Sequence, residues 1–383
     1  MLCVQITLSY FSHGAVMRRS RQETRALLNA GHRVIIITDL RWKSAYSEME
    51  EFKDKLLIIP IKPIYIYRIR SISCTLSFSF KAYYALKKLV KKESIDLIVI
   101  HASIYSFAIA RFAKKNNIPT AWVMHELIRD RATTGNPYNR WETILFMQAD
   151  FYSFSKINFL IALAKYHKKF AILDGANSDK IYIKYNPINT LEFHPLSNVS
   201  KDIDILFIGR LSIEKGIDIL IESTKYISKN RKIIIIGDGI LKKPLEDQAK
   251  QTNFDIDFKG FIKHELLPNY INRAKILVAP SRSEAHAVVP LEAMACGTPV
   301  IASRVSGMED SIQNKKNGWL LDKNNSKTLG TLIEKVLNNE ENLKVMSKAA
   351  LKRSESFSEK RFSKDIVEFY EMVVRKYNIY KKF

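Results

Sequence analysis

The residues best suited to chemistry lie in the segment 279–321, where two glutamates, Glu284 and Glu292, stand eight positions apart. An apolar run, 276–279, precedes a short polar loop that carries Glu284, and a helix can begin at Pro290, a residue favoured at the first helical position. The loop therefore opens onto a helix N-terminus, where unpaired N–H groups and the helix dipole together favour a phosphate. The N–H groups expected to point outward belong to His286, Ala287, Val288 and Val289.

Both glutamates can face one crevice, because ligands of open α/β sheets bind where the parallel strands end. Gly297 and Pro299 end the expected helix, and a second apolar run, 300–302, follows. Taken singly, each glutamate also has a simpler interpretation. Glu292 would complement the helix dipole, and Glu284 would be a solvated loop residue.

Arg210 and Lys215 follow the apolar run 205–208 in the string GRLSIEKG. The composition of that run predicts a strand buried on both faces, so Arg210 emerges at its C-terminal end, on the side of the crevice. The alternative is a pair of solvated surface cations. A further candidate, His125, ends another expected strand, although a lone histidine in such a place is more often structural than catalytic.

The composition limits the class of protein. The chain has 383 residues, 46% hydrophobic and 26% charged, which is ordinary for a globular protein and long enough for two domains. Three distant cysteines show neither disulfide nor zinc-site spacing. No stretch approaches the roughly 18 apolar residues of a spanning helix, and the apolar N-terminus fits a first strand better than a signal peptide. The net charge of +22 favours an anionic partner, or else reflects a composition set by A/T-rich codons.

Apolar runs alternate with longer amphipathic segments along the whole chain, which predicts βα repeats and parallel sheets. Two motifs are set aside. The D-x-D strings at 202–204 and 255–257 are typical of metal-and-diphosphate sites, but the first lies at the start of a strand, opposite the expected ligand end. The GDG string at 237–239 lacks the spacing of a dinucleotide-binding loop.

The string PSRSEAHAVVPLEAMACGTPV resembles the E-x7-E signature of the family-4 retaining glycosyltransferases, whose usual form is close to PS-x-x-EGFG-x-x-x-LEAMA-x-G-x-PV. GRLSIEKG resembles the family's G-R-L-x-x-x-K-G motif, and IPTAWVMHE resembles its histidine-bearing strand. The chain departs from the pattern in two places. Ala15 stands where the first loop has a second glycine after Gly14, and EAHA replaces EGFG.

The resemblance implies the α/β fold class and a GT-B architecture, two Rossmann-like domains whose parallel sheets face each other across a cleft. The expected N-terminal domain, 1–195, binds the acceptor, and the expected C-terminal domain, 196–365, binds the nucleotide-sugar. A C-terminal helix over 366–383 is expected to pack back on the N-terminal domain.

The resemblance also implies a role for each candidate residue. Arg210 and Lys215 would clamp the donor diphosphate. Glu284 would hold hydroxyls of the donor sugar, and Glu292 would bind the ribose hydroxyls. His125 would reach the sugar or phosphate, so it joins Arg210, Lys215 and Glu284 as a catalytic candidate. The remaining donor contacts are expected at Gly14, at Ile262 beside the base, and at the loop residues His286, Ala287, Val288 and Val289.

The implied activity is the retaining, metal-independent transfer of a hexosyl group from a nucleotide-diphosphate sugar to a glycan or lipid-linked acceptor, in the synthesis of a cell-surface polysaccharide such as lipopolysaccharide or capsule. No cofactor or metal is expected, because cations and N–H groups can stabilise the leaving phosphate. Two alternatives with the same fold stay open, a nucleotide-sugar epimerase and a catalytically silent nucleotide-sugar-binding protein. No nucleic-acid partner is expected, since no recognition module is visible.

The stretch 55–92 carries nine basic residues, no acidic one, and several aromatic residues. This mixture suits an anionic membrane surface, so we expect a cytoplasmic protein attached peripherally to the inner face of the cell membrane. The alternative is an ordinary helix whose lysines face solvent. In that case Phe80, Tyr83, Leu86 and Val90, which recur at helical spacing, would pack on the sheet.

Overall fold

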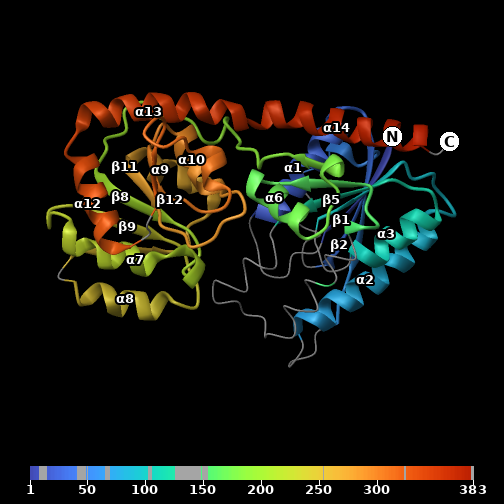
Figure 1. Ribbon diagram of the computed structural model, residues 1–383, viewed down its shortest axis with the longest axis horizontal. Helices are drawn as coiled ribbons and strands as arrows, with labels where there is room; N and C mark the ends of the chain where they lie inside the picture. The colour runs from blue at the N-terminus through green and yellow to red at the C-terminus, as the bar shows by residue number, and fades with distance from the viewer. Residues whose placement is uncertain are drawn as a thin grey trace. The chain divides into compact units, whose positions relative to one another are not determined.

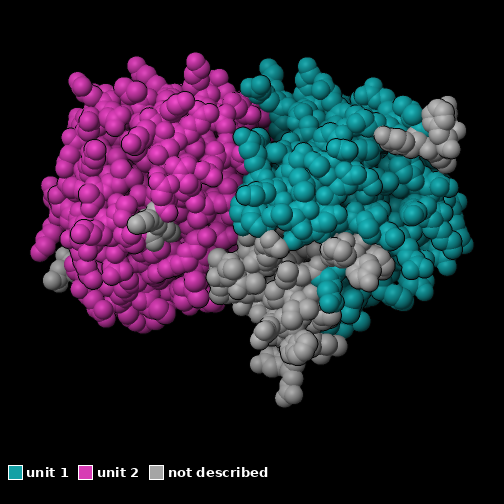
Figure 2. Space-filling model, in the orientation of Figure 1, with its two compact units in different colours: residues 1–132, 136–185, 360–383 teal, residues 133–135, 186–359 magenta. Residues whose placement is uncertain are grey.

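The computed structural model describes residues 1–7, 15–40, 49, 51–64, 70–101, 106–125, 148, 154–252, 254–322 and 325–380. The chain divides into two compact units, coloured separately in Figure 2. Unit 1 comprises residues 1–132, 136–185 and 360–383, and unit 2 comprises residues 133–135 and 186–359. Each unit is built around one parallel sheet with helices on both faces, which confirms the expected α/β class (Figure 1).

In the described part of unit 1, a parallel sheet runs in the order β3-β2-β1-β4-β5-β6-β7. Its strands are β1 (Leu2–Thr7), β2 (Arg33–Asp39), β3 (Leu56–Ile61), β4 (Leu97–Ile100), β5 (Thr120–Met124), β6 (Phe159–Ala162) and β7 (Ile181–Ile183). The helices are α1 (Ala15–Asn29), α2 (Arg70–Leu89), α3 (Ser106–Lys115), α6 (Lys165–Leu173) and α14 (Glu359–Tyr380), with a short 3-10 turn, η3 (Ser178–Lys180).

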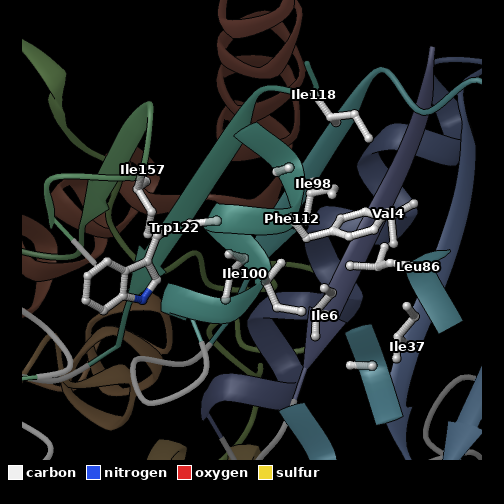
Figure 3. Close-up of a cluster of buried hydrophobic side chains, with 14 of the residues drawn as sticks. Val4, Ile6, Ile37, Leu86, Ile98, Ile100, Phe112, Ile118, Trp122 and Ile157 are labelled. Carbon is white, nitrogen blue, oxygen red and sulfur yellow. The ribbon is translucent and has the colours of Figure 1, made fainter. Parts of the chain in front are cut away.

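The strands of unit 1 are apolar on both faces, because successive side chains of a strand point to opposite sides and helices cover each side. Figure 3 shows one of these layers, in which Val4, Ile6 and Ile100 pack with Leu86 of α2 and Phe112 of α3. On the opposite face, the alternate strand residues pack against α1 and α14. This second layer includes Cys3, Ile36, Val99, Leu27 and Phe369.

In the described part of unit 2, the parallel sheet runs in the order β10-β9-β8-β11-β12-β13. Its strands are β8 (Ile203–Ile208), β9 (Ile233–Ile236), β10 (Ile256–Gly260), β11 (Ala274–Ala279), β12 (Val300–Ser303) and β13 (Trp319–Leu321). The α-helices are α7 (Ile217–Ser223), α8 (Lys242–Lys250), α9 (Leu267–Arg273), α10 (Val288–Ala295), α11 (Met308–Ser311), α12 (Ser326–Leu337) and α13 (Glu340–Ser354). The 3-10 turns are η4 (Ile213–Lys215), η5 (Thr224–Tyr226), η6 (His264–Leu266) and η7 (Glu355–Phe357).

The chain passes from unit 1 to unit 2 between residues 185 and 186 and returns between 359 and 360, whereas the sequence placed these boundaries at 195 and 365. Residues 186–195 group with unit 2 because hydrogen bonds hold them there. Asn186 N donates to Nδ1 of His286 at 3.2 Å, and Ile188 N donates to the carbonyl of Phe357 at 2.8 Å. Helix α14 returns to unit 1, where Phe369 and Tyr370 enter the core.

Among the helices that the structure describes, none combines the length and the hydropathy needed to cross a membrane.

Candidate active site

The Lys215 ammonium and the Glu284 carboxylate meet in unit 2, with Nζ 2.5 Å from Oε1. Lys215 closes the turn η4 that follows β8, and Glu284 lies in the loop between β11 and α10. Because β8 and β11 are parallel neighbours, the segments that follow them leave the same edge of the sheet. Ser281 Oγ also donates to Glu284 Oε1, at 2.8 Å, so the carboxylate is held from two sides.

Gly216 explains why these two segments approach so closely. Its φ of +66° lies in the left-handed region, and a Cβ at this position would lie 2.0 Å from the carbonyl oxygen of Pro280. Arg282 ties the segments together from the other end. Its guanidinium donates to both carboxylate oxygens of Asp218, at 2.8 and 2.6 Å, and its backbone N–H donates to the carbonyl of Glu214. These contacts fix the conformation of the loop between β11 and α10 without a ligand.

Helix α10 begins at Val288, two residues earlier than predicted, and Pro290 occupies the third position of the first turn. Ala287 is the N-cap residue, with φ of −67°, so the N–H groups without an intrahelical acceptor belong to Ala287, Val288 and Val289, since Pro290 has no N–H. In the described chain, neither Ala285 nor Ala287 has a positive φ. Alanine at these two places therefore fits the backbone without strain.

The ring of His286 is turned into unit 2, so the donor contact expected at this residue stays a prediction for its backbone N–H. The side chain is 3% exposed, and both ring nitrogens have partners within unit 2. Nδ1 accepts from Asn186 N, and Nε2 lies 3.1 Å from Ser311 Oγ. The Asn186 amide also donates to the His286 carbonyl, at 2.9 Å. His286 thus fixes the loop to the start of unit 2.

Glu292 is 1% exposed on α10, and its Oε1 lies 2.8 Å from Nε2 of His264. The other ring nitrogen of His264 lies 3.1 Å from Oε1 of Glu192, and the ring packs on Phe193 with centroids 5.0 Å apart. A carboxylate–imidazole–carboxylate arrangement therefore holds Glu292. The half-buried Ile262, expected beside the donor base, lies two residues before His264 after β10.

Arg210 and the aspartates of the first D-x-D string, Asp202 and Asp204, each lie near an oppositely charged side chain. Arg210 is half exposed, and its guanidinium lies 3.8 Å from Glu214 rather than beside Glu284. Asp202 and Asp204 lie at the start of β8 and pair with Arg273 and Lys275 at 2.6 and 2.8 Å. The hydrogen bond from Arg273 holds the pKa of Asp202 below its usual value. These aspartates brace the N-terminal edge of the sheet, away from Glu284.

In unit 1, His125 follows β5 and His101 follows β4, the neighbouring parallel strand. Nδ1 of His101 lies 3.2 Å from Nε2 of His125, and the ring centroids are 5.5 Å apart. The pKa of His125 lies well below its usual value, chiefly because the surrounding protein desolvates the ring. Gly14, the other donor candidate of this half, falls outside the described residues.

Sequence reasoning missed several residues that organise the site. Arg282, His264 and Glu192 act through partners distant in the sequence, so no local pattern marks them. The position of His101 after a strand could have indicated it, because it matches that of His125 one strand along the sheet.

Two family profiles cover most of the chain. The profile described as Glycosyl transferases group 1 matches residues 190–353, and that of Glycosyltransferase Family 4 matches residues 17–191. Among curated proteins, the uncharacterized glycosyltransferase MJ1178 of Methanocaldococcus jannaschii is 30% identical over 331 residues, which are 85% of this chain and 88% of that protein. The capsular polysaccharide biosynthesis glycosyltransferase CapM of Staphylococcus aureus is 28% identical over 217 residues, 56% of this chain and 55% of that protein.

Solved structures share the fold. Sucrose-phosphate synthase of Thermosynechococcus elongatus aligns with a TM-score of 0.83 and 20% identity, covering 98% of this chain and 99% of that one. Anabaena HepE, solved in complex with UDP and glucose, aligns with a TM-score of 0.78 and 16% identity, covering 97% of this chain and 100% of that one. These similarities confirm the GT-B architecture. Since the profiles extend over both units and MJ1178 aligns along most of its length, the chain belongs to the group 1 glycosyltransferases.

Proposed function

We propose that the protein is a retaining glycosyltransferase that moves a hexosyl group from a nucleotide-diphosphate sugar to a glycan or lipid-linked acceptor. The pairing of Lys215 with Glu284 at 2.5 Å, just before the N-terminus of α10, carries this proposal. A cation suited to bind phosphate therefore lies beside a carboxylate suited to bind sugar hydroxyls. Glu292, on the same helix, supplies the carboxylate for the ribose.

The chemistry requires stabilisation of charge rather than acid catalysis, because the leaving nucleoside diphosphate is already a stable anion. Lys215 and the first N–H groups of α10 are suited to that task, with Arg210 as a further cation. Glu284 and Glu292 belong to one loop–helix segment, so they bind hydroxyls and do not act as the acid and base pair of a glycosidase. No metal is needed for this mechanism.

A donor of the nucleotide-sugar class is supported by the fold neighbours, since Anabaena HepE was solved with UDP-glucose. A role in cell-surface polysaccharide synthesis is supported by CapM and by the structurally similar lipopolysaccharide outer core galactosyltransferase WaaB. We extend both features to this chain as proposals.

The α2 surface supports the proposed attachment to an anionic membrane. Its inward face is formed by Cys74, Phe78, Ala82 and Leu86, all fully buried. Phe80, expected on that face from helical spacing, is instead 63% exposed, with Leu76 and Tyr84 at 62% and 47%. Phe80 and Tyr84 line a groove of about 490 Å³, together with Ile59, Lys81, Ala85, Lys88, Leu89 and Lys92. Exposed apolar side chains and lysines thus share one surface in unit 1, as interfacial binding requires.

A panel of UDP-, GDP-, ADP- and dTDP-sugars tests the proposal by calorimetry and by slow donor hydrolysis. We expect one donor class to bind and to be hydrolysed, with the free sugar released in the anomeric configuration of the donor, and with the rate unchanged by EDTA. Conversion of a donor to its epimer would instead identify an epimerase. Binding without turnover, with any acceptor fraction added, would identify a silent binding protein.

A further inference from the structure

A carboxylate is sealed inside unit 1 and contacted from three elements. Glu23 of α1 is fully buried, and Arg19 Nε donates to its Oε1 at 2.7 Å. The hydroxyl of Tyr370, on α14, donates to Oε2 at 2.5 Å. Nε2 of His101, after β4, lies 3.3 Å from the same oxygen.

His101 extends this cluster to His125. Its Nδ1 lies 3.2 Å from Nε2 of His125, so a continuous chain of polar contacts leads from Tyr370 through Glu23 and His101 to His125. Every member belongs to unit 1. The last helix of the chain therefore contributes to the surroundings of a catalytic candidate on β5.

The protonation states follow from these contacts. Burial raises the pKa of Glu23, but the interactions with His101, Arg19 and Tyr370 outweigh it and lower that pKa to about 2, so the carboxylate is ionised. Arg19 balances its charge. Glu23 can only accept, so a hydrogen bond from His101 across the 3.3 Å separation uses a proton on Nε2 of that ring.

We propose that Glu23 and His101 are positioning residues that hold His125 with its proton on Nε2 and a lone pair on Nδ1. Nδ1 of His101 accepts from Nε2–H of His125, which fixes both the tautomer and the orientation of that ring. The inference rests on the proposed contact of His125 with the donor sugar. With a lone pair on Nδ1, His125 accepts a hydrogen bond, so it recognises a sugar hydroxyl rather than a phosphate oxygen.

The titratable groups that act on His125 lie on α1, after β4 and on α6. His101, Arg19 and His167 lower its pKa, and Glu23 opposes them. His125 consequently stays neutral through the physiological range, and a single tautomer is defined.

Nitrogen NMR of the full chain labelled in its histidines tests this without any substrate. The His125 signal is assigned by its loss in His125→Gln. We expect a protonated Nε2 and an unprotonated Nδ1 in the wild-type protein. A proton on Nδ1 of His125 would overturn the proposal outright, whatever the donor proves to be.

Two variants extend the test. In Glu23→Gln the neutral amide offers His101 either its oxygen or its NH₂, so we expect His125 to populate both tautomers. In Tyr370→Phe the carboxylate loses a donor while the ring packing is kept, so we expect the nitrogen chemical shifts of His101 to change. Tyr377→Phe, the same deletion on the same helix, should change neither signal. A single unchanged tautomer of His125 in folded Glu23→Gln, or unchanged His101 nitrogen shifts in Tyr370→Phe, would each count against the positioning role.

Kinetics separate this inference from the proposed function. Once a donor is identified, folded Glu23→Gln should lower kcat by about tenfold with little change in donor KM, because the ring is misoriented rather than lost. Unchanged kcat would overturn the positioning role. Absence of any nucleotide-sugar turnover together with the expected tautomer would instead refute the function and leave the geometry intact.

Discussion

Unit 1 and unit 2 each place a carboxylate beside a cation, but they do so in different ways. Arg19 and Glu23 lie four residues apart on α1, with side chains 1% and 0% exposed. Lys215 and Glu284 come from separate segments and keep 27% and 12% exposure. A sealed pair holds its neighbours in place, whereas a pair that reaches solvent can exchange its partner for a ligand. The comparison sets the proposed positioning pair of unit 1 against the proposed ligand-binding pair of unit 2.

The sealed pair should show the largest effect on stability. Arg19→Met leaves the Glu23 charge buried without a cation, so we expect unit 1 to lose about 3 to 5 kcal/mol of unfolding free energy. Hydrogen exchange of amides in α1 and the central strands measures unit 1 separately from unit 2. Arg25→Met, at a half-buried position on the same helix, is the control. A loss under about 1 kcal/mol is the ordinary effect of a point mutation, and it would mean that the Arg19–Glu23 pair does not stabilise the buried polar cluster of unit 1.

The solvent-accessible pair of Lys215 and Glu284 should instead affect turnover more than stability. Lys215→Ala is expected to lower kcat by about 10²- to 10³-fold, the usual cost of removing a group that stabilises transition-state charge, with little change in unfolding. The control is Lys225→Ala, a 63% exposed lysine 3.7 Å from Glu222. Turnover at the wild-type rate with saturating donor would show that Lys215 belongs with the structural pairs.

Much of the fold could be predicted from the sequence because strands buried on both faces produce short apolar runs, which alternate here with longer amphipathic segments. The runs 97–100, 205–208 and 233–236 all lie in strands. Local motifs also indicated that Lys215 and Glu284 belong to one site, since both follow strands of a parallel sheet. Such a pattern carries information only about what is near in sequence.

Contacts between distant segments have no such local signal. The loop position of His286 gave no sign that Asn186 and Ser311 would supply buried partners for its ring. Pro290 suggested the first helical position, but a proline is tolerated throughout the first turn. The link from Tyr370 to Glu23 spans 347 positions, and no periodicity reports a contact of that range.

Unit 1 should also show a pH dependence of stability that arises from a buried histidine. His167 of α6 is fully buried, and burial lowers its pKa from 6.5 to about 4. The unfolded chain takes up this proton near pH 6.5 and the folded chain only near pH 4. The stabilisation is therefore complete above pH 6.5 and is lost on acidification towards pH 4, by about 3 kcal/mol.

His167→Met removes this titration, so the slope of unfolding free energy between pH 6.5 and 4 should become shallower. His125, whose pKa is also lowered, leaves a residual slope of the same sign. Urea unfolding at several pH values measures the slope for the wild type and for His167→Met, with the exposed-site variant His194→Gln as the control. Parallel curves for wild type and His167→Met would show that His167 is not titrating as a buried neutral group.

Glu292 tests whether the buried carboxylate of unit 2 still serves a ligand. Glu292→Gln should weaken nucleoside-diphosphate binding by about 1 to 3 kcal/mol, the range for hydrogen bonds to a charged group. Calorimetry with UDP, GDP and ADP measures it, and exposed Glu265→Gln is the control. Unchanged affinity for all three would assign Glu292 to His264 alone, making it the counterpart of Glu23.

The smallest expected effect concerns the α2 surface of unit 1. Here the comparison is between a lysine of unit 1 and a lysine of unit 2, and the measured quantity is binding to anionic vesicles. Lys88 lines the apolar groove beside Phe80 and Tyr84, so its ammonium would lie at the headgroup level of a leaflet that the aromatic side chains enter. Lys88→Gln should weaken binding to anionic vesicles by about 1 kcal/mol, or about fivefold, because each cation near the surface contributes that much. Lys348→Gln, an exposed lysine of unit 2 with the same change in charge, should leave sedimentation with phosphatidylserine vesicles unaltered.

Binding should fall as salt is raised, since these charges are screened within about 10 Å at 0.1 M. Equal recovery of the wild-type protein from neutral and anionic vesicles at low salt would remove the membrane from the proposal and leave the α2 lysines as a solvated face.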